Sequence, residues 1–145
     1  MDPVDLSELL HMSEELDRSL RCLSEDADEI APDGAEVRLL ATTDRASMAH
    51  FRIQPGQVTR AVKHRGIDEL WYVTSGDGEL WLQDRGVEEG RQHVLQTGLS
   101  IAIRTGASFQ CRNNAETVLD IVAVQVPPWS GDAEAIIVAG PFDPQ

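Results

Sequence analysis

Two stretches of the chain carry glycines at wide, regular intervals. Residues 56–76 read GQVTRAVKHRGIDELWYVTSG, and residues 98–113 read GLSIAIRTGASFQCRN. Between the glycines lie β-branched and aromatic residues, which is typical of short strands separated by tight turns. The same pattern extends from residue 36 to residue 126, with no helical period of roughly 10–15 residues to interrupt it. The two stretches therefore predict an all-β fold.

The expected strands are short and closely spaced. They are predicted at 37–41, 48–53, 57–64, 69–74, 79–83, 93–95, 99–103, 109–112 and 118–126. Clusters of glycine, asparagine and aspartate lie between them and mark the turns. Many short strands at near-regular spacing predict a sandwich or a barrel. Residues 127–145 hold four of the seven prolines and predict an extended tail with one short strand at 135–138.

The two glycine-punctuated stretches resemble the paired signature motifs of the cupin superfamily. Every spacing of both motifs is met, and the resemblance covers roughly residues 36–126. It implies a double-stranded β-helix, or jelly-roll barrel, with an internal pocket. The matching anchor residues are Gly56, His64, Glu69, Gly76, Gly98, Gly106 and Asn113.

Three signature positions hold other residues. Val62 stands at the first histidine position, Phe109 at the histidine of the second motif, and Arg104 where proline is usual. In metal-binding cupins those two histidines hold one metal ion together with the residues at His64 and Glu69. Two protein ligands rarely hold Zn²⁺, Fe²⁺ or Mn²⁺. The expectation is therefore a cupin without the usual metal centre and without a cofactor.

Alternation along the strands predicts which side chains face the barrel interior. The set expected there is His64, Glu69, Arg60, Val62, Trp71, Phe109 and Cys111. This gives apolar walls with one imidazole, one carboxylate and one guanidinium, a combination typical of a small-molecule site. Because Arg60 would lie beside His64, an anionic ligand is expected.

His64 and Glu69 are candidate acid–base catalysts. A histidine–carboxylate pair can transfer a proton near neutral pH. The first hypothesis is a metal-independent lyase, isomerase or cyclase acting next to a carbonyl group in bacterial metabolism. A purely structural pair explains the same residues, and the chain is then a ligand-binding cupin without chemistry. The third hypothesis is a metalloenzyme whose rebuilt site uses His64, Glu69 and His50.

The acidic surplus of the chain is concentrated at one end. The 145 residues carry a formal net charge of -13, and residues 1–34 hold 11 acidic and two basic residues, a net charge of -9. Leucines at three- and four-residue steps predict a helix over 3–24. Three segments follow: an acidic helical leader and linker at 1–34, a barrel at 35–126 and an extended tail at 127–145.

The charge also excludes some partners. Nucleic acids and anionic membrane surfaces attract clustered lysine and arginine, so neither is expected to bind this chain. No run of 18 apolar residues and no secretory signal are present, which favours a cytoplasmic protein with two reduced cysteines. The leucine stripe of the leader is expected to pack on the barrel or on a second subunit. Since cupin barrels commonly pair their edge strands, a homodimer is expected.

Overall fold

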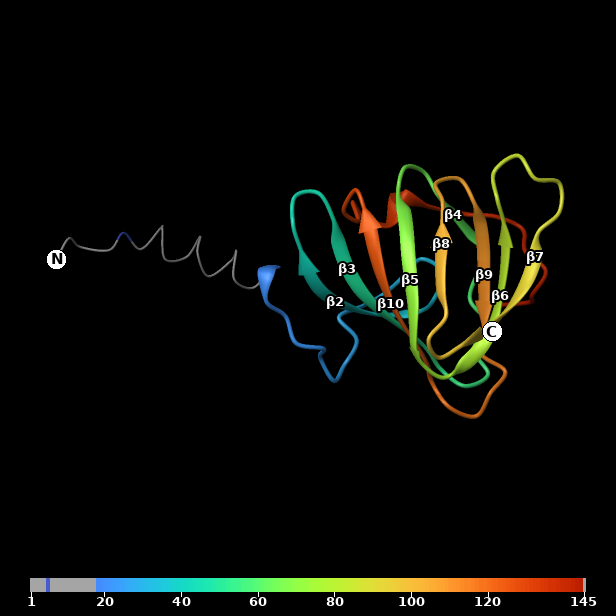
Figure 1. Cartoon of the computed structure of the whole chain (residues 1–145), viewed down its shortest axis with the longest axis horizontal. Coiled ribbons are helices and arrows are strands. Elements are labelled where there is room, and N and C mark those ends of the chain that lie inside the picture. Colours follow the sequence, from blue (N-terminus) through green and yellow to red (C-terminus); the bar gives the residue numbers. More distant parts are fainter. Residues whose placement is uncertain (1–4, 6–17, 145) are drawn as a thin grey trace.

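The computed structural model describes residue 5 and residues 18–144, which form two antiparallel sheets around one core (Figure 1). The first sheet has the order β1-β2-β3-β10-β5-β8, with β1 (Glu29–Ile30), β2 (Glu36–Thr42), β3 (Ser47–Ile53), β10 (Leu119–Val126), β5 (Asp68–Ser75) and β8 (Ser100–Ile103). The second has the order β11-β4-β9-β6-β7, with β11 (Ala135–Ile137), β4 (Val62–His64), β9 (Ser108–Arg112), β6 (Asp77–Gln83) and β7 (Arg91–Gln96). The all-β double-stranded β-helix predicted from the sequence is confirmed.

Alternating burial explains why these segments form strands. In β5, Glu69, Trp71 and Val73 are buried, whereas Leu70 and Tyr72 between them are exposed. Each strand therefore presents one face to a core shared by the two sheets. That core is built mainly from aliphatic and aromatic side chains.

The glycines of the two sequence motifs lie in the turns. Gly56, Gly76, Gly98 and Gly106 all have positive φ, which glycine adopts without steric cost. Gly76 joins β5 to β6, and a Cβ atom there would lie 2.3 Å from the carbonyl oxygen of Val118. The tight approach of β10 to this turn therefore requires glycine.

The structure has a strand at each of the nine places expected between residues 36 and 126, but one is much shorter than predicted. The segment expected to be strand over 57–64 enters the sheet only at Val62. Before that point the backbone N–H of Arg60 donates to the carbonyl of Asp33, and only an isolated bridge joins Val58 to Arg112. The chain there follows β9 without forming a regular strand.

The N-terminal part differs from the predicted leader and linker. Most of the helix expected over 3–24 lies outside the described residues; Arg18 and Ser19 have helical backbone, and residues 20–24 are not helical. The predicted linker contains β1, which pairs with β2. Among the residues described, no helix is long and apolar enough to cross a membrane.

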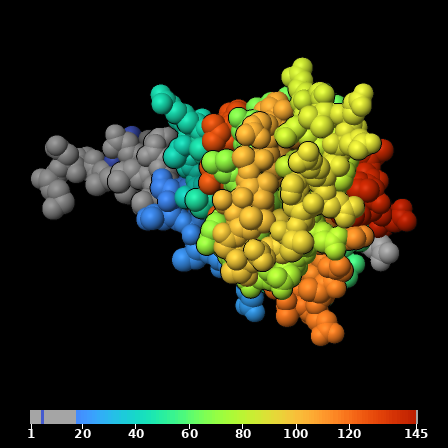
Figure 2. Space-filling model, turned by 45° about the vertical axis from the view of Figure 1, so that its right-hand side comes forward, coloured from blue at the N-terminus to red at the C-terminus, as the bar shows by residue number. Residues whose placement is uncertain are grey.

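The C-terminal tail is fastened to the second sheet. A 3-10 turn, η1 (Asp132–Glu134), leads into β11, which pairs with β4. Further on, the side-chain amide of Gln110 donates to the carbonyl of Phe142 and accepts from its backbone N–H. Figure 2 shows these last residues, in deep red, on the opposite side of the molecule from the blue residues that begin at Arg18.

Candidate functional site

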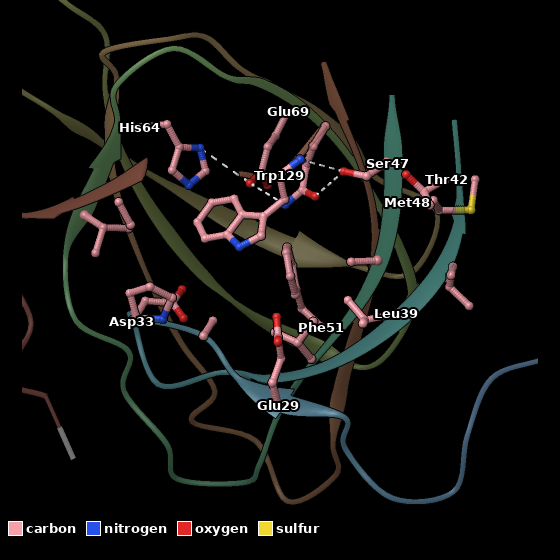
Figure 3. Close-up of a pocket in the computed structure, with 18 of the residues that line it drawn as sticks. Glu29, Asp33, Leu39, Thr42, Ser47, Met48, Phe51, His64, Glu69 and Trp129 are labelled. Carbon is pink, nitrogen blue, oxygen red and sulfur yellow. Dashed lines mark hydrogen bonds and ion pairs between the residues drawn. The ribbon is translucent and has the colours of Figure 1, made fainter. Parts of the chain in front are cut away.

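A cavity of about 290 Å³ lies between the two sheets, bounded by β1 to β5, β9, β10, β11 and the segment that follows β10 (Figure 3). Most of its wall is apolar. The polar side chains gather in it from distant parts of the sequence. The lining residues are Arg21, Glu29, Ala31, Pro32, Asp33, Val37, Leu39, Leu40, Thr42, Ser47, Met48, Ala49, Phe51, Val62, His64, Glu69, Phe109, Gln125, Trp129 and Ala135.

A row of polar side chains crosses three neighbouring strands of the first sheet. Gln125 on β10 is the Cα partner of Ser47 on β3 and of Glu69 on β5. The Ser47 hydroxyl donates to Oε1 of Gln125 at 2.7 Å, and Nε2 of Gln125 donates to Oε1 of Glu69 at 3.3 Å. Strand register therefore fixes the position of the Glu69 carboxyl.

Glu69 is almost completely buried, and both of its oxygens accept hydrogen bonds. The indole N–H of Trp71 donates to Oε2 at 2.5 Å, in addition to the Gln125 amide at Oε1. Burial raises the pKa of Glu69 to about 7, although the two donors pull it down and the Asp33 carboxylate raises it further. A carboxyl group with this pKa can give or take a proton near neutral pH.

His64 lies against Glu69 at the end of β4. Its Nδ1 atom is 3.4 Å from Oε1 of Glu69, and the imidazole contacts the rings of Phe109 and Trp129 edge to face at centroid distances of 5.3 and 5.5 Å. Burial lowers the pKa of His64, and the Glu134 carboxylate acts in the opposite direction. The neutral imidazole is therefore favoured. In Figure 3 its second nitrogen points away from Glu69.

The metal-signature positions do not supply a ligand set. Val62 and Phe109 are Cα partners on β4 and β9, and both are buried apolar residues. His64 and Glu69 remain as two ligands. Within the described part of the chain, no three His, Cys, Asp or Glu side chains are placed to hold a metal ion. The residues present do not fit the metal centre of metal-binding cupins.

His50, the third ligand of the rebuilt-site hypothesis, does not join His64 and Glu69. Its neighbours in β3, Ala49 and Phe51, line the cavity, so strand alternation places His50 on the other face of the sheet. There its Nε2 atom lies 3.1 Å from Oδ1 of Asp120. Burial lowers the pKa of His50, against the attraction of that carboxylate.

Three other predicted site residues do not line the cavity. Arg60 is exposed. Strand alternation predicts an inward side chain at this position, but β4 begins only at Val62, so the alternation does not extend to residue 60. Trp71 is buried behind Glu69, where it orients the carboxyl group. Cys111 lies in the core, and burial raises the pKa of its thiol well above the usual value.

Several cavity residues were absent from the sequence prediction. Asp33 fell in the expected linker, and Trp129 in the tail expected on the surface. The backbone N–H of Trp129 donates to the Ser47 hydroxyl at 2.9 Å, which seats the indole over His64. The sequence does contain a signal that could have identified Gln125 as a cavity residue: it is a polar residue at an inward position of a mostly apolar strand.

Comparison with known proteins gives a consistent family and fold. The family model described as the cupin domain matches residues 49–125. A protein from Bacillus halodurans, BH2720, shares 23% identity over 66% of this chain and 72% of its own, with a TM-score of 0.60. An uncharacterized conserved protein with a double-stranded β-helix domain from Klebsiella pneumoniae shares 18% over 86% of this chain and 95% of its own, with a TM-score of 0.59.

A larger enzyme also contains this fold. Bacillus subtilis oxalate decarboxylase, described with Mn(II) centres, shares 13% identity over 79% of this chain and 30% of its own, with a TM-score of 0.64. At such identities the likeness shows the fold alone.

Proposed function

The chain belongs to the cupin family, and on that premise we propose that its cavity binds a small organic molecule and moves a proton next to a carbonyl group. The reaction class is that of a metal-independent lyase, isomerase or cyclase. One observation carries the proposal: an imidazole and a carboxyl group meet inside a buried, mostly apolar cavity.

The chemistry follows from the positions of the two side chains. When Glu69 is ionised, it favours the His64 tautomer that carries its proton on Nδ1, so the Nε2 lone pair is free to act as a base. Nε2 takes a proton from the carbon beside the carbonyl, and the ionised Glu69 stabilises the imidazolium that forms. Return of that proton to a different carbon is an isomerisation. Loss of a leaving group from the enolate is an elimination.

The distance between the two groups is compatible with this role. The 3.4 Å between Nδ1 and Oε1 exceeds an ordinary hydrogen bond, and catalytic hydrogen bonds in unliganded sites are often long and tighten when ligand binds. The pKa of Glu69, raised to about 7, lies where a general acid or base is most effective.

A second candidate function is ligand binding without chemistry. It is favoured by the hydrogen bonds of Glu69, because both carboxyl oxygens already accept from Trp71 and Gln125. In that case the Glu69 carboxyl group only fixes the core around the cavity.

The two candidates are separated by deuterium exchange. Cyclohexanone, acetophenone and 4-piperidone are incubated with the protein in D₂O, and exchange of the hydrogens beside the carbonyl is followed by NMR. Wild-type protein is expected to accelerate exchange of at least one ketone, and His64→Ala and Glu69→Gln to lose an acceleration of about 10²- to 10⁴-fold. His93→Ala removes an exposed histidine and is the matched control. Equal exchange by wild type and both site variants would refute the acid–base role.

A further inference from the structure

We propose that the cavity selects an organic cation: a compact molecule with one protonated amine on an apolar body. This deepens the proposed function by naming the class of ligand. It rests on the cavity being the ligand site, but it does not require the proton transfer.

The ionisable side chains that face the cavity are predominantly acidic. Glu29, Asp33 and Glu69 line it, and the only basic side chain among its described lining residues other than histidine is Arg21, which is exposed. The expectation of an anionic ligand depended on Arg60, whose side chain is exposed and does not line the cavity. The wall therefore attracts positive charge.

Two of the carboxyl groups lack an arginine or lysine partner in the described structure. Oδ1 of Asp33 accepts the backbone N–H of Ala35 at 3.0 Å, and no arginine or lysine pairs with either Asp33 or Glu69. Burial raises the pKa of both carboxyl groups, since a charge in this environment is poorly solvated. An ammonium group beside either of them would supply a counter-charge. In Figure 3, Glu69 lies at the upper end of the cavity and Asp33 at the lower left.

A buried histidine nitrogen without a hydrogen bond gives a second indication. His64 is 5% exposed, lines the cavity and makes no hydrogen bond at Nδ1. Because burial favours the neutral imidazole, the ring has a nitrogen that can accept a hydrogen bond. A protonated amine offers donors and no acceptor, which suits a cavity whose imidazole nitrogen and carboxylates accept hydrogen bonds.

The apolar wall suits the remainder of such a ligand. Phe51, Phe109 and Trp129 line the cavity, and the faces of aromatic rings attract cations. The volume of about 290 Å³ is at the small end for ligand sites, so the ligand is of single-ring size.

The test compares three probes of similar shape: benzylammonium, benzyl alcohol and benzoate. Binding is followed by NMR through the indole N–H signal of Trp71, which reports on Glu69 directly. Benzylammonium is expected to bind about tenfold more tightly than benzyl alcohol, and benzoate more weakly than either. Asp33→Asn and Glu69→Gln should each reduce this preference about fivefold or more.

The variants are matched for fold and charge. Asn at position 33 keeps the oxygen that accepts from Ala35, so Asp33→Asn is expected to fold even if Glu69→Gln is destabilised. Asp77→Asn removes one negative charge at an exposed position away from the cavity and should leave the preference unchanged.

Two results overturn the inference. One is benzoate or benzyl alcohol binding as tightly as benzylammonium; the other is no shift with any probe up to about 10 mM, which is weaker than a matched single-ring ligand should bind. If ketone exchange persists and depends on His64 in either case, the proposed function stands and only the ligand class is wrong.

Discussion

Nδ1 of His64 lies 3.4 Å from Oε1 of Glu69, and the two residues belong to opposite sheets. Residues 65–67 carry the chain from β4 across to β5. Burial disfavours the charged form of both groups. It therefore raises the pKa of Glu69 to about 7 and lowers the pKa of His64. The neutral forms of both groups are therefore favoured, and the pair can hold one proton on the Glu69 carboxyl group.

The stability of the protein should depend on pH through Glu69. Its pKa is about 7 in the folded chain against 4.5 ordinarily, so its contribution is fully present below pH 4.5 and is lost as the pH rises through 7. Between about pH 5 and pH 8 the wild type should lose about 2–3 kcal/mol of unfolding free energy that Glu69→Gln does not lose. Urea unfolding at both pH values measures this difference.

His64 affects stability in the opposite direction and is present in both proteins. Its lowered pKa contributes stability above pH 6.5 that is lost as the pH falls. Glu89→Gln, at an exposed position, should follow the wild type. Parallel losses for wild type and Glu69→Gln would show that the carboxyl is not held in its neutral form.

The fold could be predicted because its signals are local. Gly56, Gly76, Gly98 and Gly106 mark turns that require positive φ, and alternation between them sets the inward face of each strand. For the same reason Val62, His64, Glu69 and Phe109 were placed correctly in the barrel interior.

The remainder of the site depends on long-range contacts that a local pattern does not contain. Arg60 was misplaced because parity holds only within a continuous strand, and the strand begins at Val62. Asp33 and Trp129 reach the cavity from segments before β2 and after β10, brought there by backbone hydrogen bonds to Arg60 and to the Ser47 hydroxyl.

Metal binding should be absent from the wild type and recoverable by substitution. Val62 and Phe109 are Cα partners, and Val62 lies on the same face of β4 as His64. Untagged wild-type protein should retain less than about a tenth of an equivalent of Zn²⁺ or Mn²⁺ after dialysis, whereas Val62→His with Phe109→His should retain about one.

The matched control for this experiment is Val62→Ala with Phe109→Ala, which opens the same space without adding ligands. Elemental analysis of the dialysed proteins measures the metal. A full equivalent in the wild type would overturn the metal-independent proposal. No gain in the histidine variant would show that these positions do not converge with His64 and Glu69.

The side-chain amide of Gln125 should lower the pKa of Glu69. Gln125→Met keeps the length of the side chain but removes the N–H that donates to Oε1. Loss of a hydrogen bond to the charged form should raise the Glu69 pKa by about one unit. Titration of the ¹³C-labelled carboxyl group measures it, with the signal assigned through Glu69→Gln. Gln96→Met, on the exposed surface of β7, should leave the value unchanged.

Trp129 should determine how far the His64 imidazole is shielded from water. Its ring contacts the imidazole edge to face, and burial is the main cause of the lowered pKa of His64. Trp129→Ala should admit water and bring this pKa up toward 6.5, with a loss of about 1–2 kcal/mol in stability because the indole is only partly buried. NMR titration of the histidine signals measures the shift, and Trp81→Ala, outside the cavity, is the control. An unchanged His64 pKa in Trp129→Ala would mean that the barrel wall, and not the tail, keeps the imidazole desolvated.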